Sequence, residues 1–222
     1  MIDKSLFKFL SDLEKNNNRD WFNENKPTFK AHEAEAKRFF KEVEARLQVS
    51  DNIEKHKIMR IYRDVRFPKD KTPYNPRFAG SFSRATPALR GSYFLNIQPG
   101  GNSIVGGGFY GPNADDLKRI REEFAFDDSE IRNILADPKF KKTYGEMQGA
   151  ELKTAPRGFD PEHKAIDLIR KKQFYFIRRF SDKEVLAPNF MDEVIDSFET
   201  IRPYFDYMSM VLTTDANGES IL

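Results

Sequence analysis

The chain has 222 residues, of which 39% are hydrophobic and 32% charged, and its formal net charge is +2. This length and composition are typical of a soluble globular protein, and we expect a single domain over residues 1–222. The chain contains no cysteine, which excludes disulfide bonds, a thiol nucleophile and any cysteine-ligated metal.

Helical periodicity dominates the N-terminal quarter of the chain. Apolar residues recur at helical spacing between Leu6 and Leu13, and Asp3 is the expected N-cap. Asn18 is expected to cap a short helical turn. A long helix is predicted from about Pro27 to Gln48, because this segment has one apolar face and charged residues elsewhere.

The pattern changes to strands in the middle of the chain. The segments predicted as strands are Ile58–Tyr62, Gly80–Arg84, Ser92–Gln98, Asn102–Phe109 and Phe174–Phe180. A glycine-rich turn at residues 99–102 is expected to join two of these strands in a hairpin.

Helical patterns return at Asn113–Phe124 and Asp128–Ala136, and Asp137-Pro138 is expected to end the second helix. A last long pattern from Phe190 to Met208 contains Pro203, which is expected to kink it or divide it into two helices. Strands and helices do not alternate regularly, which favours an α+β fold with a mainly antiparallel central sheet flanked by N- and C-terminal helices.

The core is expected to be aromatic, because the chain contains 21 phenylalanines. Six residues on the apolar faces of the predicted elements are expected to be buried: Phe40, Val43, Phe94, Phe174, Phe198 and Phe205.

The sequence shows no segment that would direct the chain into a membrane. Its first residues lead into an amphipathic pattern without the apolar region of a signal peptide. No run approaches the roughly 18 apolar residues of a membrane span. We therefore expect a cytoplasmic protein that does not bind a membrane.

The segment from Lys57 to Arg90 concentrates positive charge. Nine of its residues are basic and two are acidic, so its formal charge is +7 and the remainder of the chain carries −5. Several fixed cations together create a positive potential that attracts anions, so this segment is where an anion is expected to bind. Arg side chains match phosphate or carboxylate oxygens in pairs, and Lys adds a point charge.

The loop that follows the first predicted strand carries most of the candidate site. Pro68 and Pro73 stiffen this loop, which reduces the entropy lost when long cations are ordered around a ligand. Tyr74 supplies a hydroxyl and a stacking face. The residues that we predict to bind the ligand are Arg60, Arg63, Arg66, Lys69, Lys71, Tyr74, Lys153 and Arg157.

An alternative interpretation of the same segment is an internal network of ion pairs. Arg63 would pair with Asp64, and Lys69 or Lys71 would pair with Asp70 or with acidic residues of the helices. Lys153 and Arg157 are also open to two interpretations. They flank Pro156 in a loop that completes the anion pocket, or they lie in solvent on a turn shaped by Pro156 and Gly158.

Other motifs give little support for a cofactor or a metal. Gly106-Gly-Gly-Phe-Tyr-Gly111 matches the dinucleotide fingerprint, but Pro112 follows it and no ribose-binding acid is evident. We favour a strand end where a large neighbour packs over bare backbone. The histidines His32, His56 and His163 share no metal spacing, so we expect no metal site and no cofactor.

Five stretches of the chain together resemble the bacterial domain-of-unknown-function family 2461. They are NNNRDWF (Asn16–Phe22), NKPTF (Asn25–Phe29), RDVRFPKDKTPY (Arg63–Tyr74), GGGFYGP (Gly106–Pro112) and LKTAPRGFD (Leu152–Asp160). The resemblance covers nearly the whole chain and implies a single α+β domain. It implies no activity and no catalytic residues.

Three functions remain open from the sequence. The favoured one is a pocket for a small phosphate- or carboxylate-bearing ligand. The alternatives are binding of a nucleic-acid backbone, with aromatic residues interleaved among the cations, and an interaction module whose basic face meets an acidic partner. The −5 outside the basic segment argues against wide nucleic-acid contact. No motif identifies a reaction or an oligomeric state.

Overall fold

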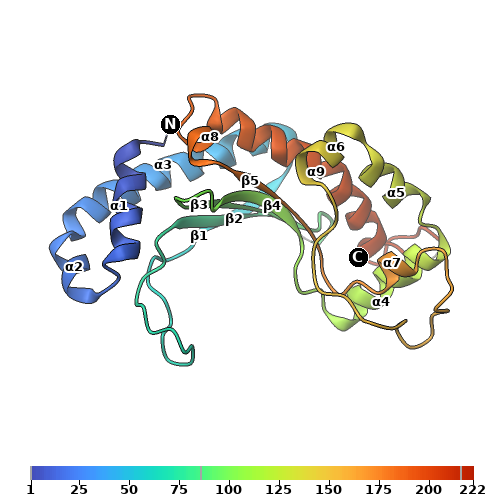
Figure 1. Cartoon of the computed structure of the whole chain (residues 1–222). Coiled ribbons are helices and arrows are strands. Elements are labelled where there is room, and N and C mark those ends of the chain that lie inside the picture. Colours follow the sequence, from blue (N-terminus) through green and yellow to red (C-terminus); the bar gives the residue numbers. More distant parts are fainter. Residues whose placement is uncertain (1, 86, 216) are drawn as a thin grey trace. The chain divides into compact units, whose positions relative to one another are not determined.

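The computed structural model describes residues 2–85, 87–215 and 217–222. Its elements are, in chain order, α1 (Lys4–Lys15), α2 (Arg19–Glu24), α3 (Lys26–Ser50), β1 (Ile53–Ile58), β2 (Phe78–Arg84), β3 (Ser92–Ile97), β4 (Ser103–Phe109), α4 (Ala114–Phe126), α5 (Ser129–Ala136), α6 (Pro138–Tyr144), α7 (Ile166–Ile169), β5 (Phe174–Phe180), α8 (Asp182–Val185) and α9 (Phe190–Thr213). Figure 1 shows them as a ribbon coloured along the sequence.

The described strands form one five-stranded antiparallel sheet in the order β1-β2-β3-β4-β5. Each strand therefore lies beside its neighbours in the sequence, and helices precede and follow the sheet along the chain (Figure 1). The predicted α+β fold with a mainly antiparallel sheet flanked by terminal helices is confirmed.

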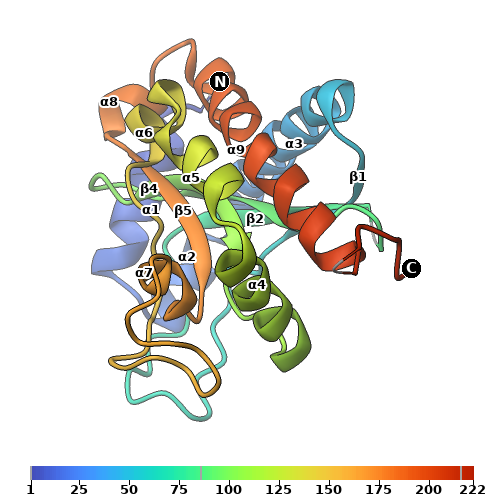
Figure 2. The ribbon, with the colours of Figure 1, turned by 90° about the vertical axis from the view of Figure 1, so that its right-hand side faces the viewer.

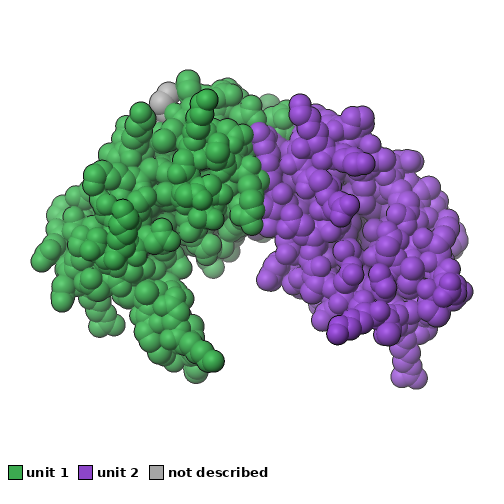
Figure 3. Space-filling model, viewed as in Figure 1, with its two compact units in different colours: residues 1–82, 94–105, 179–196 green, residues 83–93, 106–178, 197–222 purple. Residues whose placement is uncertain are grey.

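The chain forms two compact units, which Figure 3 colours separately. Unit 1 comprises residues 1–82, 94–105 and 179–196, and unit 2 comprises residues 83–93, 106–178 and 197–222. The boundaries fall inside β2, β3, β4 and β5, so these strands contribute residues to both units. The single domain expected from the sequence stays a prediction.

In unit 1, the long helix α3 packs on strand β2. Phe40 stacks on Phe82 with ring centroids 6.0 Å apart, and both rings are buried. Gly80 makes room for this contact, because a Cβ there would lie 2.7 Å from the Phe40 ring. Phe39 on the same helix stacks on Phe190 at the start of α9, with centroids 5.6 Å apart. This burial of aromatic rings explains why α3 needs an apolar face.

In unit 2, aromatic side chains of α4, α6 and α9 pack on strand β5. Figure 2 shows these elements as ribbons. Phe140 of α6 meets Phe176 edge-on at 4.9 Å, and Phe124 of α4 meets Phe174 edge-on at 6.0 Å. The buried hydroxyl of Tyr204 on α9 donates to the carbonyl of Phe174 at 2.9 Å. This bond satisfies a polar group that would otherwise be costly to bury.

The glycine run lies within strand β4, and large neighbours pack over its bare backbone as the sequence predicts. A Cβ on Gly106 would lie 2.1 Å from the carbonyl oxygen of Phe176, and one on Gly107 would lie 2.6 Å from the buried ring of Phe205. The missing side chains therefore serve close packing of the sheet.

One predicted strand is wrong. Residues 58–62 were expected to form the first strand, but β1 is Ile53–Ile58, and Tyr62 makes only an isolated bridge to Tyr74. The strand β1 lies at the edge of the sheet and carries the charged run Glu54–Lys57. Charged side chains are common on edge strands because they prevent further pairing, and they hide the strand pattern in the sequence.

Helix boundaries follow the predicted caps closely. Asp3 accepts a hydrogen bond from the amide of Ser5, and Asn18 accepts one from the amide of Trp21. Helix α5 ends at Ala136 as expected, but Asp137 also caps a new helix, α6, by accepting from the amide of Phe140. A proline directly after a cap suits the first helical turn. The Asp137-Pro138 pair therefore ends one helix and begins the next, whereas the sequence indicated only the end.

The last helix continues as one element through Pro203. No described helix combines the length and apolar character that crossing a bilayer requires. Five of the six residues expected in the core are buried, namely Phe40, Val43, Phe174, Phe198 and Phe205. Phe94 is wrong in degree, because its ring is only half-buried on strand β3.

The packing over Gly106 predicts a difference between two glycines of the same run. Gly106→Ala should lower the free energy of unfolding by about 1–3 kcal/mol, because the new methyl group collides with backbone. Gly111→Ala should change it by less than about 1 kcal/mol, since a Cβ at Gly111 has no neighbour within 4 Å. Chemical denaturation measures both values, and equal effects would contradict the packing.

Candidate functional site

Residues 60–74, which we call the basic arm, leave the sheet after β1 and return to β2 (Figure 1). The arm belongs to unit 1. An antiparallel bridge between Tyr62 and Tyr74 closes the base of the arm. Two backbone hydrogen bonds flank this bridge, one donated by the amide of Arg63 at 2.8 Å and one donated by the amide of Asn75 at 2.7 Å. The two ends of the arm are therefore held side by side.

The base of the arm is fixed to the segment that joins α1 to α2. The side-chain amide of Asn17 donates to the Tyr74 carbonyl at 2.9 Å, and its oxygen accepts from the Tyr74 amide at 3.1 Å. The Phe22 ring of α2 stacks on the Tyr74 ring with centroids 4.0 Å apart. Tyr74 is buried, and this burial raises the pKa of its phenol. Its ring is thus a structural anchor of the arm.

Two ion pairs lie within the arm. Arg63 donates to the carboxylate of Asp70 at 2.5 Å and to the hydroxyl of Thr72. Arg66 forms a two-pronged contact with Asp64, at 3.0 Å from Nε and 2.6 Å from Nη2. The sequence suggested Asp64 as the partner of Arg63, whereas the fold of the loop brings Asp70 to it instead.

Lys71 serves the shape of the arm directly. Its ammonium group donates to the carbonyl of Val65 at 2.8 Å and to that of Arg66 at 3.3 Å. These bonds join the two sides of the loop. Lys71 therefore stabilises the arm from within while its charge adds to the local positive potential.

The carboxylates of the arm stay ionised well below neutral pH. The hydrogen bond from Arg63 lowers the pKa of Asp70 to about 2, with help from the amide and hydroxyl of Thr72. The hydrogen bond from Arg66 lowers the pKa of Asp64 and raises that of Arg66 itself. Hydrogen bonding to the charged form is the cause in each case.

The arm also carries exposed side chains that lie outside its two ion pairs. Residues 60–74 contain five basic and two acidic side chains, a formal charge of +3. Within the described part of the chain, the exposed side chains of Arg60 and Lys69 make no hydrogen bond or ion pair. Phe67 is 86% exposed, and the guanidinium of Arg66 lies over its ring at 5.6 Å.

Lys153 and Arg157 belong to unit 2, where both are exposed on the loop between α6 and α7. This loop makes the turn that its sequence indicates. The amide of Phe159 donates to the carbonyl of the buried Pro156 at 3.2 Å, and Gly158 has a φ of +90°. The convergence of Lys153 and Arg157 with the basic arm stays a prediction.

The histidines take part in local contacts. His32 lies 3.4 Å from Glu35, and His56 lies 2.7 Å from Glu44. Over residues 2–85, 87–215 and 217–222, no group of three or more His, Asp or Glu side chains has the arrangement of a metal site.

The anchor at Tyr74 generates a prediction about Asn17. Asn17→Ala should lower the free energy of unfolding by about 1–3 kcal/mol, because two backbone groups of Tyr74 lose their partner. The Tyr74 amide should also exchange its hydrogen faster. Asn23→Ala is the matched control, since this exposed side chain makes no hydrogen bond in the described structure. Equal exchange of the Tyr74 amide in the two variants would refute the anchor.

The Arg63–Asp70 pair generates a prediction about pH. Because the pKa of Asp70 is about 2 in the folded chain and ordinarily about 3.9, the pair stabilises the arm above pH 4. This contribution should be lost as the pH falls from about 4 to 2. Carboxyl NMR titration should show the low pKa of Asp70, and Arg63→Gln should raise it. The pKa of Asp64 should stay the same in Arg63→Gln, which makes Asp64 the internal control. An unchanged pKa of Asp70 in this variant would contradict the pairing.

Comparison with known proteins identifies a family and nothing more specific. Residues 5–207 match the family model described as conserved hypothetical protein (DUF2461), so the chain belongs to this family. No curated protein matches the chain, and no solved structure does either.

Proposed function

We propose that this member of the family uses the basic arm to bind a small ligand that bears phosphate or carboxylate groups. The observation that carries the proposal is that some cations of the arm make contacts within the loop and others do not. Arg63 and Lys71 hold the loop, whereas Arg60 and Lys69 are exposed and make no such contact within the described residues. The arm therefore carries a formal charge of +3 on an exposed loop, and the bridge between its two ends fixes the base of that loop.

Arg66 supports the same proposal through its remaining donors. A guanidinium group has five N–H bonds, and the contact with Asp64 engages Nε and Nη2 only. The side chain of Arg66 is 76% exposed. Its free edge can thus donate to a second anion while Asp64 holds the group in place, which reduces the entropy lost on binding. The proposal concerns binding and assigns no reaction.

A thermal shift experiment with pyrophosphate as the probe tests the proposal. Ligand binding to the folded chain should raise its stability by about 2.7 kcal/mol at a hundredfold excess over the dissociation constant. Arg60→Gln/Lys69→Gln should lose most of this response, because both residues lie outside the internal pairs.

The control removes the same charge from another part of unit 1. Lys26→Gln/Lys41→Gln changes two exposed lysines of α3, so it should keep the response to pyrophosphate if the arm is the site. If pyrophosphate does not stabilise the wild type, or if both double variants lose the response equally, the arm is not an anion-binding site.

A second candidate is binding of a single-stranded nucleic acid, and Phe67 favours it. This ring is exposed, the guanidinium of Arg66 lies over it, and exposed aromatic rings stack on bases. Phe67→Ala should weaken binding of a thymidine oligonucleotide by about 1–3 kcal/mol and leave pyrophosphate binding unchanged. An oligonucleotide affinity that does not respond to Phe67→Ala, or no affinity at all, would remove this candidate.

A further inference from the structure

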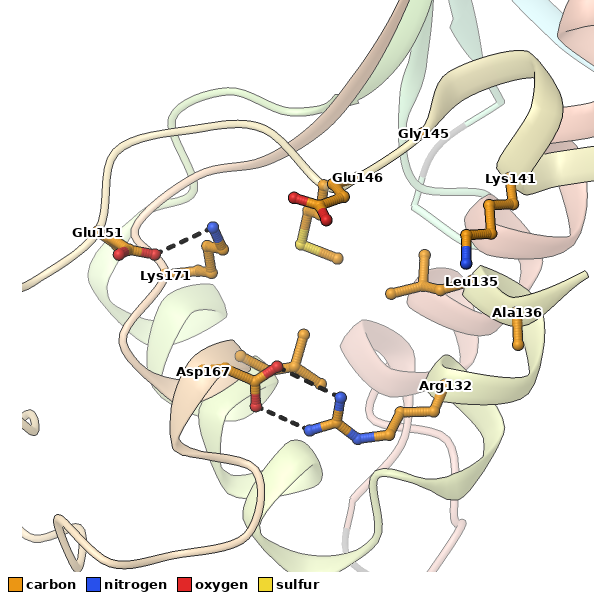
Figure 4. A pocket seen from close by; sticks show the side chains of 11 residues that line it. Arg132, Leu135, Ala136, Lys141, Gly145, Glu146, Glu151, Asp167 and Lys171 are labelled. Atoms are coloured by element: carbon orange, nitrogen blue, oxygen red, sulfur yellow. Dashed lines mark hydrogen bonds and ion pairs between the residues drawn. The ribbon is translucent and has the colours of Figure 1, made fainter.

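Unit 2 contains a cavity of about 600 Å³ between α5, α6 and α7 that the basic arm does not line (Figure 4). Its size lies in the range of small-molecule sites. Met147 and Leu168 are buried at its wall, and Leu135 of α5 is half-buried beside them. These three side chains form the apolar part of the wall, and Leu135 is the most accessible of them.

The charges around this cavity balance one another. Three basic and three acidic side chains line it, so its formal charge is zero. A ligand with a net charge therefore gains little from the cavity as a whole. What distinguishes the site is how these six charges are arranged.

Four of the charges form two ion pairs, drawn as dashed lines in Figure 4. Arg132 donates to both oxygens of Asp167, at 2.7 and 3.3 Å. Lys171 lies 3.0 Å from Glu151. The hydrogen bonds that Arg132 donates to Asp167 and Asp128 raise the pKa of Arg132, and the bond that Lys171 donates to Glu151 lowers the pKa of Glu151. These four groups therefore pair with one another in two ion pairs.

The remaining two charges are Lys141 and Glu146, which have opposite signs. Both are exposed, and neither side chain makes a hydrogen bond or ion pair within the described residues. Gly145, with a φ of +67°, ends α6 between them and turns the chain. Figure 4 shows Lys141 on the wall beside Leu135 and Glu146 on the wall toward Lys171.

A separated cation and anion above an apolar surface suit a ligand with the same three features. We infer that this cavity binds a short peptide with free termini and apolar side chains. Its carboxylate would meet Lys141, its ammonium group would meet Glu146, and its side chains would contact Met147 and Leu168. A peptide of two residues places its charges several ångströms apart, as two different walls require, since each residue extends the chain by about 3.5 Å.

Isothermal titration calorimetry of the full chain with leucyl-leucine tests this inference. Two blocked ligands isolate the termini: N-acetyl-leucyl-leucine lacks the ammonium group, and leucyl-leucine amide lacks the carboxylate. Each should bind about tenfold more weakly than leucyl-leucine or worse, because one charge-assisted hydrogen bond is lost. Absence of binding by leucyl-leucine at millimolar concentration, or equal binding of all three ligands, would overturn the inference.

Variants assign each terminus to its residue. Lys141→Gln should weaken binding of leucyl-leucine about tenfold but leave the affinity for leucyl-leucine amide unchanged. Glu146→Gln should also weaken binding of leucyl-leucine about tenfold but leave the affinity for N-acetyl-leucyl-leucine unchanged. Lys142→Gln is the control, because this exposed neighbour does not line the cavity. Thermal unfolding checks that all three variants fold. Variants that weaken all ligands equally, or leucine binding as tightly as leucyl-leucine, would contradict a peptide that spans the two walls.

Discussion

The hold of Asn17 and Phe22 on Tyr74 decides where the basic arm begins and ends. Asn17 pairs with the backbone of Tyr74 much as a neighbouring strand would, at 2.9 and 3.1 Å, and Phe22 covers the ring. The bridge from Tyr74 to Tyr62 then brings the other end of the arm into place. The position of every cation in the arm depends on this base. Loss of the contacts to Tyr74 would therefore leave these cations without a fixed arrangement.

Electrostatics within the arm act on orientation more than on stability. Ion pairs between exposed side chains contribute little to folding, about 0–1 kcal/mol, and Arg66 and Asp64 are both largely exposed. What such pairs do is limit the rotamers of long side chains, and that lowers the entropy lost when a ligand binds. The same reasoning applies to unit 2, where paired charges leave Lys141 and Glu146 as the groups that a ligand can satisfy.

Local signals in the sequence predict much of this fold and little of the site. The caps at Asp3 and Asn18 and the apolar alternation of strands are local features that a sequence pattern can predict. The structure confirms the elements predicted from them. The strand β1 is not predictable in this way, because an edge strand tolerates the charged run Glu54–Lys57. The choice of Asp70 as partner of Arg63 depends on the path of the loop, which no spacing rule supplies. The two units share strands, so no linker marks their boundary.

Binding of an anion at the basic arm would be reported most directly by the guanidinium groups of the arm. Arginine Nε–H signals of the isotopically labelled protein can be followed by NMR while pyrophosphate is added. The signals of Arg60 and Arg66 should shift and saturate together, with amide shifts confined to residues 60–74. Shifts that saturate elsewhere in the chain while these two signals stay unchanged would contradict it.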